Sequence, residues 1–407
     1  MTRPRSSLTV ALLVSLALGV GAEARANSVY SVGGLGEPSL EEGARLRALG
    51  GAGVAEHGDR THSFVNPASM AEAQHLLIEV TILPSYRRIE SVNFGKETGR
   101  ETALPSLRAL IRLPADLVVA GSYLVGTNAH FDLLRAENAG TPSTVRIEGR
   151  GGIDFIRVSL ARKATPGLRL GVDYEIIAGS FREEWSRDFA DTALATARDT
   201  LETTYSREGR WRIGAQFSRG PVSVGGVYET ARRLPLTIRQ RTAGTVVTRE
   251  GESITIPSGF AAGISASISE RLRVLGQYRR ANWNRESLAS DLVDFRAEER
   301  YSFGVERGRA LAAGGGLLSR LPIRVGATLL RWPDLLPVSG ASSIAGGTAD
   351  ITEVAFSIGT GLQSRDKGGA IDLSLEAGSR GSKDDLGVSE RFLRFAISLQ
   401  VSDDTWK

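Results

Sequence analysis

The sequence predicts an all-β protein, a 14-stranded antiparallel transmembrane β-barrel with an N-terminal hatch, or plug, inside its lumen. Three observations support this fold. Apolar and polar residues alternate with a period of two in segment after segment from residue 76 onwards. The links between these segments are either very short or long and polar. The stretch that precedes them is compact and rich in glycine, so it is suited to fill the space that the strands enclose.

The first 26 residues have the features of a secretory signal peptide. Arg3 and Arg5 give a positive start, an apolar run covers residues 8–20, and residues 24–26 form an Ala-Arg-Ala cleavage site. We therefore divide the chain into three parts: signal peptide 1–26, hatch 27–75 and barrel 76–407. Beyond the signal, no stretch approaches the roughly 20 consecutive apolar residues that a membrane helix needs.

Composition excludes several classes of function. The chain has no cysteine, so it has no disulfide, no thiolate metal site and no catalytic cysteine. Its formal net charge is only +4 over 407 residues, which does not indicate a nucleic-acid partner. We expect an exported protein that packing and hydrogen bonds alone hold together.

The hatch is centred on residues 46–70, where two turn-forming motifs lie close together. Glycine permits positive φ and close backbone approach, while proline fixes one dihedral and removes a donor. Such a segment makes sharp turns and does not form a long helix or strand. We predict a hatch or gate motif made of the residues Gly50, Gly51, Gly53, Asn66, Pro67 and Ala68.

The alternating segments give the strand count. They are residues 76–90, 103–113, 116–126, 152–163, 167–180, 209–219, 221–231, 257–269, 271–283, 299–309, 320–331, 352–363, 369–379 and 390–401. The number is even, as bacterial single-chain barrels require. Residues 234–248 alternate only partly, and we assign them to a hairpin within a loop. If they entered the barrel, the count would be odd, or sixteen with a partner strand.

The lengths of the links distinguish a membrane barrel from a soluble sandwich, which would show the same alternation. The short links are 114–115, 164–166, 219–220 and 269–270. The long links are 127–151, 181–208, 232–256, 284–298 and 332–351. Short turns on one rim and long loops on the other are typical of outer-membrane barrels. The sequence thus predicts a multi-pass β-barrel in the bacterial outer membrane.

Two local predictions accompany the barrel. Trp283, Trp332 and Trp406 fall at predicted strand ends, where an aromatic girdle would place them, although tryptophan also occurs at strand ends in soluble proteins. Residues 188–201 have helix-like spacing of apolar side chains, so we expect a short surface helix over the barrel mouth.

In this setting the hatch and the last hairpins resemble the FadL/TodX family of outer-membrane fatty acid and hydrocarbon transporters. The residues that carry the resemblance are 27–31, 33–36, 47–53 and 66–68 in the hatch, 257–283 in a late hairpin, and 359, 380–381 and 390–406 in the tail. The family implies a 14-stranded barrel that passes a hydrophobic ligand from its loops to a lumen site beside the hatch. It also implies release by a hatch rearrangement, in known cases through a lateral opening. The end of this chain lacks the family's usual terminal aromatic residue, although Trp406 stands one position before it.

No catalytic constellation stands out in the sequence. The four histidines are His57, His62, His75 and His130, and we expect solvated loop histidines in preference to a ligand site. No Ser-His-Asp order with a nucleophile elbow occurs, and the glycines near residue 50 lack the lysine of a phosphate loop. We therefore predict no enzyme, no cofactor and no metal site.

Arginines recur on the faces that we predict to point into the lumen. They are Arg157, Arg169, Arg212, Arg273, Arg324 and Arg394. A guanidinium holds a carboxylate in a bidentate fork, so some of them are candidates to anchor the head group of a fatty acid. The alternative is that they pair with inward carboxylates, namely Asp173, Glu175, Asp372 and Glu376, and simply keep the lumen polar.

These features favour passive outer-membrane transport of hydrophobic molecules such as long-chain fatty acids or hydrocarbons. Its expected partners are the hydrophobic ligand and outer-membrane lipid, with no nucleic acid, and we expect a monomer. An alternative is a barrel that acts as an assembly or docking partner for exported proteins. A soluble exported β-protein and a barrel enzyme are further alternatives.

Overall fold

A computed structural model describes most of the chain. It covers residues 28–31, 35–58, 62–73, 76–92, 95–137, 141–191, 193–284, 294–308, 321–337, 348–363 and 368–403. The predicted signal peptide, His75 and Trp406 lie outside these residues. Within them, no helix has the length and apolar character needed to cross a membrane.

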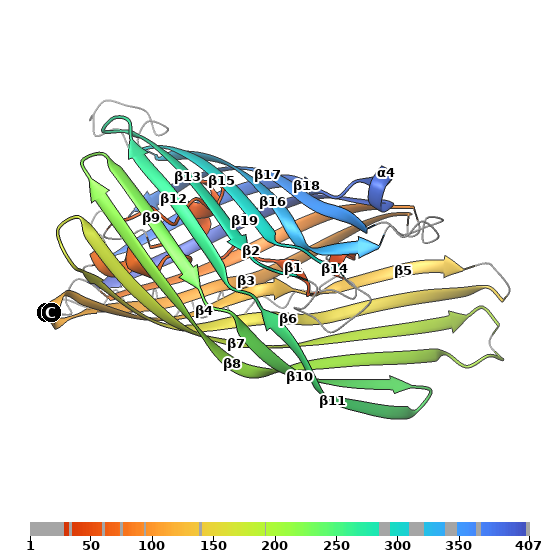
Figure 1. The fold of residues 1–407 in the computed structure, drawn as a ribbon. Helices are drawn as coiled ribbons and strands as arrows, with labels where there is room; N and C mark the ends of the chain where they lie inside the picture. The colour runs from red at the N-terminus through yellow and green to blue at the C-terminus, as the bar shows by residue number, and fades with distance from the viewer. Residues whose placement is uncertain are drawn as a thin grey trace, which may run out of the picture.

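Strands dominate the structure (Figure 1). The short helices are η1 (Val29–Ser31), α2 (Ala44–Arg47), η2 (Pro67–Glu72), η3 (Pro114–Asp116) and α4 (Lys383–Leu386). The strands are β1 (Glu37–Pro38), β2 (Leu76–Ser91), β3 (Gly95–Leu113), β4 (Leu117–Asn128), β5 (Phe131–Glu137), β6 (Ser143–Lys163), β7 (Leu168–Phe189), β8 (Ala197–Arg219), β9 (Val222–Glu229), β10 (Arg232–Thr242), β11 (Thr245–Ile256), β12 (Gly259–Ser267), β13 (Leu272–Ala281), β14 (Asp294–Phe295), β15 (Glu298–Arg307), β16 (Ile323–Pro337), β17 (Thr348–Gln363), β18 (Gly369–Arg380) and β19 (Val388–Asp403).

The strands close into one antiparallel barrel. Each strand pairs with its neighbours along the chain, and β19 pairs with β2 to complete the circle. Four strands are interrupted once, so that β4 and β5, β9 and β10, β11 and β12, and β14 and β15 are each two parts of one long strand. With β1 left aside as part of the plug, fourteen strands form the wall, which confirms the predicted fold class.

The long links predicted from the sequence differ from the structure in one respect. Much of 127–151, 181–208 and 232–256 is not loop but strand, which extends the wall beyond the barrel. In Figure 1 the strands β5, β6, β7, β8, β10 and β11 project together from one end, and we call them the extracellular sheet. The short links predicted at 114–115, 164–166, 219–220 and 269–270 lie at the opposite end.

The predicted helix over residues 188–201 was wrong. Strand β7 continues to Phe189, and β8 already begins at Ala197. The pairing of β6 with β7 runs without a break from Lys163 and Arg169 to Ser143 and Phe189. The strand pairing supplies hydrogen-bond partners for the backbone of this segment, and a short isolated helix is only marginally stable. Pairing with the neighbouring strands therefore overrides the helix-like spacing of the apolar side chains.

Residues 234–248 form the hairpin that the sequence predicts, but the hairpin is not a separate loop. Strand β10 pairs with β8 on one side and with β11 on the other. Its two arms continue the barrel strands β9 and β12, so the strand count stays even.

The outer wall is apolar. Along β7, Leu170 and Tyr174 are exposed, whereas Arg169, Asp173 and Glu175 between them are buried in the lumen. The same alternation leaves leucine, isoleucine, valine and aromatic side chains exposed around the wall. A closed barrel with an apolar outer face is a structure for a lipid bilayer, which confirms the predicted location in the bacterial outer membrane.

The predicted tryptophan girdle was wrong for the two residues described. Trp332 is fully buried and packs edge-on against Tyr30 of the plug, and Trp283 packs against buried residues of the lumen. Trp332 points inward because the alternation along β16 places it, like Leu330, on the lumen face, whereas Trp283 lies just beyond the end of β13.

Other aromatic residues form a row on the outer face of neighbouring strands. Tyr174 stands opposite Trp211 on β8, with ring centroids 4.9 Å apart. The row continues around the wall through Tyr228, Phe260, Tyr278 and Tyr301. We call these six residues the aromatic belt.

The described residues of the N-terminal part, 28–31, 35–58 and 62–73, lie inside the barrel, and we call them the plug. Helix α2 contacts β17, β18 and β19, whereas η2 contacts β6, β7 and β8 on another side. The plug therefore touches the inner wall over a large part of its circumference, as the red and orange ribbon inside the strands shows (Figure 1).

Inward-facing glycines make room for the plug backbone. A Cβ atom on Gly214 of β8 would lie 2.2 Å from Oδ1 of Asn66, and one on Gly326 of β16 would lie 2.1 Å from the backbone nitrogen of Gly50. The other wall glycines with such close contacts to the plug are Gly171, Gly225, Gly304 and Gly359. The wall thus accepts backbone where other barrels would place side chains.

Replacement of a wall glycine is expected to displace the plug and leave the barrel intact. Gly214→Val inserts a side chain into the volume that Asn66 occupies, and such overpacking costs about 1–3 kcal/mol. Amide hydrogen exchange of residues 62–73 should become faster, with the wall strands unchanged. Gly121→Val is the matched control, because a Cβ there meets no atom within 4 Å. Equal exchange in both variants would contradict the inference that the wall glycines make room for the plug backbone.

Candidate functional site

Asn66, Pro67 and Ala68 build the start of the helix η2 against the wall. Asn66 is the N-cap, and its Oδ1 accepts a hydrogen bond of 3.0 Å from the backbone N–H of Ala68. Its Nδ2 donates to the carbonyl oxygen of Val54 at 2.7 Å, which joins two parts of the plug. Proline at the first helical position needs no donor partner there. The motif therefore fixes a turn inside the plug and its contact with the wall.

The three predicted glycines serve a second turn. Gly50 and Gly51 have φ of +67° and +80°, a region that other residues enter only with strain. Gly53 donates its N–H to Oε1 of Gln277 on β13 at 2.9 Å, as does Val54 beside it. The turn after α2 is thereby tied to the wall through a buried side chain.

A first ionic cluster surrounds the plug carboxylate Glu37. Three wall arginines donate to it: Arg87 at 2.7 Å, Arg380 at 2.6 Å and Arg394 at 2.5 Å. They come from β2, β18 and β19, which are adjacent in the wall. Wall carboxylates complete the cluster, namely Glu353, Glu376 and Glu390. One plug side chain therefore accepts from arginines of three adjacent strands within a cluster that also holds wall carboxylates.

A second ionic cluster surrounds Glu41, four residues further along the plug. Arg157 donates to it at 2.5 Å, Arg279 at 2.8 Å and Arg212 at 3.3 Å. These arginines come from β6, β13 and β8, in another sector of the wall from the first cluster. The remaining members are Arg210, Glu175 and Glu229. The short segment from Glu37 to Glu41 thus spans the lumen between two groups of buried arginines.

The six arginines predicted as head-group anchors all face the lumen, and the structure gives each an acidic partner. Arg157 and Arg212 belong to the second cluster and Arg394 to the first. Of the other three, Arg169 binds Glu72 and Arg273 binds Glu56 of the plug, and Arg324 binds the two wall carboxylates Glu306 and Asp372. In this state of the plug their guanidinium groups hold carboxylates of the chain itself.

The plug carboxylates differ in their protonation. The surrounding arginines hold the pKa of Glu37 and of Glu41 well below the usual range, against the opposing effect of burial. Burial raises the pKa of Glu42 to about 7, because its hydrogen bonds come from the hydroxyl of Ser63 and the backbone N–H of Phe64 and not from a guanidinium. One segment thus carries two permanent anions and one carboxyl group that titrates near neutrality.

Strands β3 and β4 separate part of the way along the wall. Their pairing ends at Ser106 and Leu124, although both strands continue beyond that point. The plug strand β1 takes up the freed edge of β4, where Glu37 stands opposite Asn128. A cavity of about 70 Å³ lies at this place, and Leu83, Pro105 and Leu330 contribute to its walls. The backbone of β1 thus takes the place of β3 beside the end of β4, while Glu101 of β3 still reaches across to Nδ2 of Asn128 at 2.8 Å.

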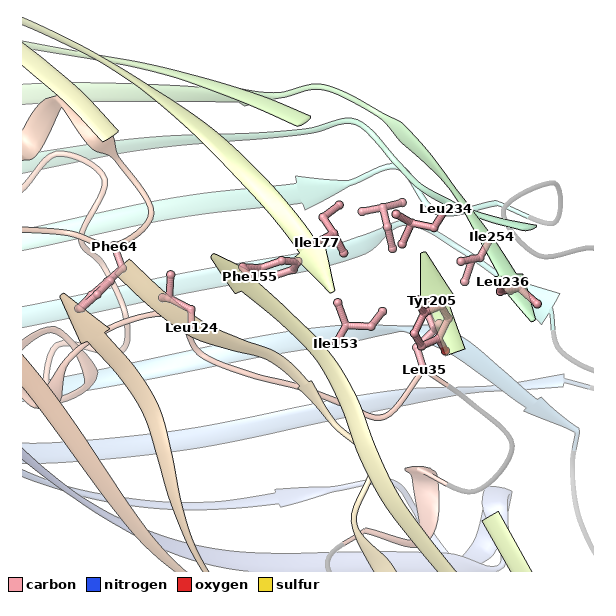
Figure 2. Close-up of a cluster of buried hydrophobic side chains, with 11 residues drawn as sticks. Leu35, Phe64, Leu124, Ile153, Phe155, Ile177, Tyr205, Leu234, Leu236 and Ile254 are labelled. Atoms are coloured by element: carbon pink, nitrogen blue, oxygen red, sulfur yellow. The ribbon is translucent and has the colours of Figure 1, made fainter. Parts of the chain in front are cut away.

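An apolar cluster lines the lumen on the extracellular side of the plug (Figure 2). Leu35 and Phe64 come from the plug, and the other members come from the strands of the wall and the extracellular sheet. The wall members are Leu124, Ile153, Phe155, Ile177, Tyr205, Leu234, Leu236, Ile254 and Ile256. A second cavity of about 70 Å³ borders this cluster and is lined in part by Phe155 and Trp283. By probe-occupied volume, either cavity holds a few water molecules.

The histidines contribute little to these sites. His62 is buried in the plug with Nδ1 3.2 Å from the carbonyl oxygen of Ser69, and Nδ1 of His130 lies 2.6 Å from Oδ1 of Asn128. Among the described residues, no group of His, Asp and Glu side chains has an arrangement that would hold a metal ion.

Sequence reasoning missed Glu37 and Glu41, which pair the plug with the wall, and Glu42, which joins two parts of the plug through Ser63 and Phe64. A signal for them was present. Three carboxylates lie within six residues of a segment predicted to fill the lumen, and the predicted lumen faces are rich in arginine. Because buried charges need partners, these acids were candidates for the missing counter-charges.

Removal of a clustered plug carboxylate is expected to loosen the plug. Glu37→Gln or Glu41→Gln leaves buried arginines short of a partner, which costs about 3–5 kcal/mol when a buried pair is broken. Hydrogen exchange of residues 35–58 should accelerate strongly in either variant. Glu250→Gln on the exposed face of β11 is the matched control and should behave as the wild type does. Unchanged protection in both cluster variants would show that the ion pairs do not hold the plug.

The plug is also expected to respond to pH in two directions. The pKa of Glu42 is raised in the folded plug. Its contribution to the stability of the plug is therefore complete below about pH 4.5 and is lost as pH rises through about 7. The pKa values of Glu37 and Glu41 are lowered in the folded plug. Their contribution to its stability is therefore present above pH 4.5 and is lost on acidification below that pH. Plug protection, corrected for intrinsic exchange, should be greatest near pH 4.5, where both contributions are present, and should fall on either side. Glu42→Gln should abolish the alkaline loss, and an unchanged alkaline limb in that variant would refute the assignment.

Solved structures with a similar fold cover almost the whole chain. A FadL homologue from Pseudomonas aeruginosa has a TM-score of 0.65 at 11% identity, covering 90% of this chain and 99% of that one. The toluene transporter TodX from P. putida has a TM-score of 0.57 at 13% identity, with coverage of 90% and 99%. The monoaromatic hydrocarbon channel CymD has a TM-score of 0.55 at 15% identity, with coverage of 89% and 98%. These identities establish a shared fold, that of the FadL/TodX barrels.

Sequence comparison gives the family. No curated protein matches the chain. The family model described as BamG matches residues 5–219 and 236–407, which together make up most of the sequence. The unmatched residues 220–235 include β9 and the start of β10. The barrel, its plug and this match together identify the chain as a member of the BamG family.

Proposed function

We propose that this protein is a passive outer-membrane channel for hydrophobic molecules such as fatty acids or hydrocarbons, with the plug as its gate. The observation that carries the proposal is the apolar cluster above the plug, which includes Phe155, Leu234 and Ile254. A water-filled barrel has a polar interior and needs no such lining. A lining of this kind replaces the burial that a greasy solute loses on leaving the membrane, worth about 0.8 kcal/mol per methylene.

The apolar path begins in the extracellular sheet. A second group of buried apolar residues, Phe131, Leu133, Val145, Ile147 and Phe181, covers the lumen side of β5, β6 and β7. It leads along the same strands toward Ile153 and Phe155 of the apolar cluster. A hydrophobic ligand captured by the sheet would therefore remain against apolar side chains until it meets the plug.

The separation of β3 and β4 is the exit that we propose for the ligand. At this place the wall is completed by β1 of the plug and not by a barrel strand. Movement of Glu37 out of the first ionic cluster would take β1 with it and open the wall beside Pro105. The ligand would then leave sideways into the bilayer, where its tail is most stable. No energy source is needed, since the ligand moves down its own gradient.

The structural neighbours support this proposal by their described roles. TodX is described as a toluene transporter and CymD as a monoaromatic hydrocarbon channel. Neither description is of an enzyme, which agrees with the absence of a catalytic constellation from the sequence. For this chain, we infer the class of ligand from the apolar lining of its own lumen, and the experiment below tests that inference.

The first test is native mass spectrometry of the mature protein extracted from outer membranes. We expect an acyl chain or another hydrophobic molecule to remain bound. Leu234→Asn places an amide at the centre of the apolar cluster, where an unsatisfied polar group costs about 1–3 kcal/mol, and should reduce retention about tenfold. Val247→Asn on the exposed face of β11 is the control. An empty lumen in the wild type, together with no uptake of hydrophobic probes into proteoliposomes, would overturn the channel.

A second candidate is a barrel that docks other exported proteins. Two observations favour it: the cavities beside the plug are small, and the extracellular sheet offers a free edge at β11, which in the described part of the chain pairs only with β10. Unpaired strand edges are sites where another chain adds a strand. The same extraction distinguishes the two candidates, because a protein that co-purifies in fixed ratio with an empty barrel would support docking.

A further inference from the structure

A row of arginines crosses the outer face of the extracellular sheet. The strand register places Arg150 of β6 opposite Arg182 of β7, Arg182 opposite Glu202 of β8, and Glu202 opposite Arg239 of β10. Residues that stand opposite one another in a sheet share a face, so these four side chains form one row. We call Arg150, Arg182, Glu202 and Arg239 the arginine row.

The row lies above the lipid-facing part of the wall. Arg182 follows Tyr174 of the aromatic belt along the outer face of β7, with Ile176 and Ser180 between them. On β7 the outer side chains are apolar as far as Ala178, and Ser180 then leads to Arg182. On β8 and β10, the exposed Arg207 and Arg233 lie between the apolar part of the wall and the row. An aromatic belt marks the level of the membrane interface, so the arginine row is placed on the side of the lipid head groups.

Charge is segregated on this face. The row itself has three arginines and one glutamate, whereas the next row outward holds Asp132, Glu148 and Glu184, which stand opposite one another on β5, β6 and β7. These outer carboxylates are already paired. Arg146 binds Asp132 at 2.7 Å and Glu148 at 2.9 Å, and Arg198 binds Glu184 at 3.0 Å. On β6 and β7 the arginine row thus lies on the membrane side of the carboxylate row, whose charge Arg146 and Arg198 balance from further outward.

Two arginines of the row have no carboxylate of their own among the described residues. Arg182 contacts Glu202 and Glu184, each at 3.3 Å, but neither Arg150 nor Arg239 has a carboxylate of the described chain within ion-pair distance. Arg150 also stands directly opposite Arg182, and like charges in that position destabilise a sheet. An anion bound between them would convert this repulsion into attraction.

We propose that the arginine row binds the phosphate groups of the glycolipid that forms the outer leaflet, lipopolysaccharide. Arginine presents a planar fork of donors that matches phosphate oxygens, and the exposed row requires no rearrangement to receive them. The row lies eight residues beyond Tyr174 along β7, outside the apolar part of that strand, which is the side on which the phosphates of a membrane-embedded glycolipid stand. A soluble anion would show no such preference for the membrane side. The site would anchor the extracellular sheet to the leaflet surface.

The test measures binding of lipid A, the phosphate-bearing glycolipid, to the detergent-purified full chain. The triple variant R150Q/R182Q/R239Q removes the row. Its matched control, R162Q/R219Q/R271Q, removes three exposed arginines near the short turns at the opposite rim. Three further probes are chemically dephosphorylated lipid A with the same acyl chains, phosphatidylglycerol and inorganic phosphate. Sheet content by circular dichroism and heat-modifiable gel mobility establish that each variant is folded.

We expect the triple variant to bind lipid A about 100-fold more weakly than the wild type, since each interfacial arginine contributes about fivefold. The control should bind as the wild type does, and dephosphorylated lipid A should bind weakly to all three proteins. If the triple variant misfolds, Arg239→Gln alone should lose about fivefold. Equal binding of lipid A by wild type and row variants would overturn the proposal. So would equal binding of the dephosphorylated lipid, or a preference for inorganic phosphate or phosphatidylglycerol.

Discussion

The structure depends on the pairing of buried charges between plug and wall. Glu37 and Glu41 each sit among three arginines, and an unpaired charge in such a place would cost several kcal/mol. Neither the plug acids nor the wall arginines are stable alone in a closed lumen. The barrel therefore specifies the position of its plug electrostatically, and the plug in turn makes an arginine-rich lumen tolerable.

Packing against the wall glycines sets how closely the plug approaches the strands, and the ion pairs set the orientation of the plug in the lumen. The wall glycines let the backbone near Gly50 and Asn66 approach the strands more closely than any side chain would allow. Apolar contacts of this kind are not directional, whereas a carboxylate in an arginine fork fixes a rotation. A plug held in this way is fixed to the wall at two separate places in the lumen. The carboxyl group of Glu42 titrates near neutrality, so the same segment has one contact whose contribution to plug stability changes with pH.

The wall presents three environments to three kinds of neighbour. Apolar side chains face the lipid, with the aromatic belt at one level. The lumen beside the plug is ionic, and the lumen above it is apolar around Phe155 and Ile254. Beyond the lipid, the extracellular sheet is apolar inside and charged outside. Because the strand period is two, a single strand such as β7 serves two of these environments at once at every level.

The sequence by itself determined the features that follow from periodicity. Alternation gave the barrel and its fourteen strands, the short links gave the rim of tight turns, and the glycines with Asn66-Pro67-Ala68 marked the segment that lies in the lumen. These are local signals, and backbone geometry translates them directly into structure. Tertiary structure decided everything that depends on which residues meet. Much of residues 188–201 is strand because β7 and β8 extend along their neighbours. Trp332 packs against Tyr30 in the lumen. The lumen arginines form ion pairs with Glu37 and Glu41. Pairings between residues hundreds of positions apart leave no mark in local spacing, since only the closed barrel brings them within reach of one another.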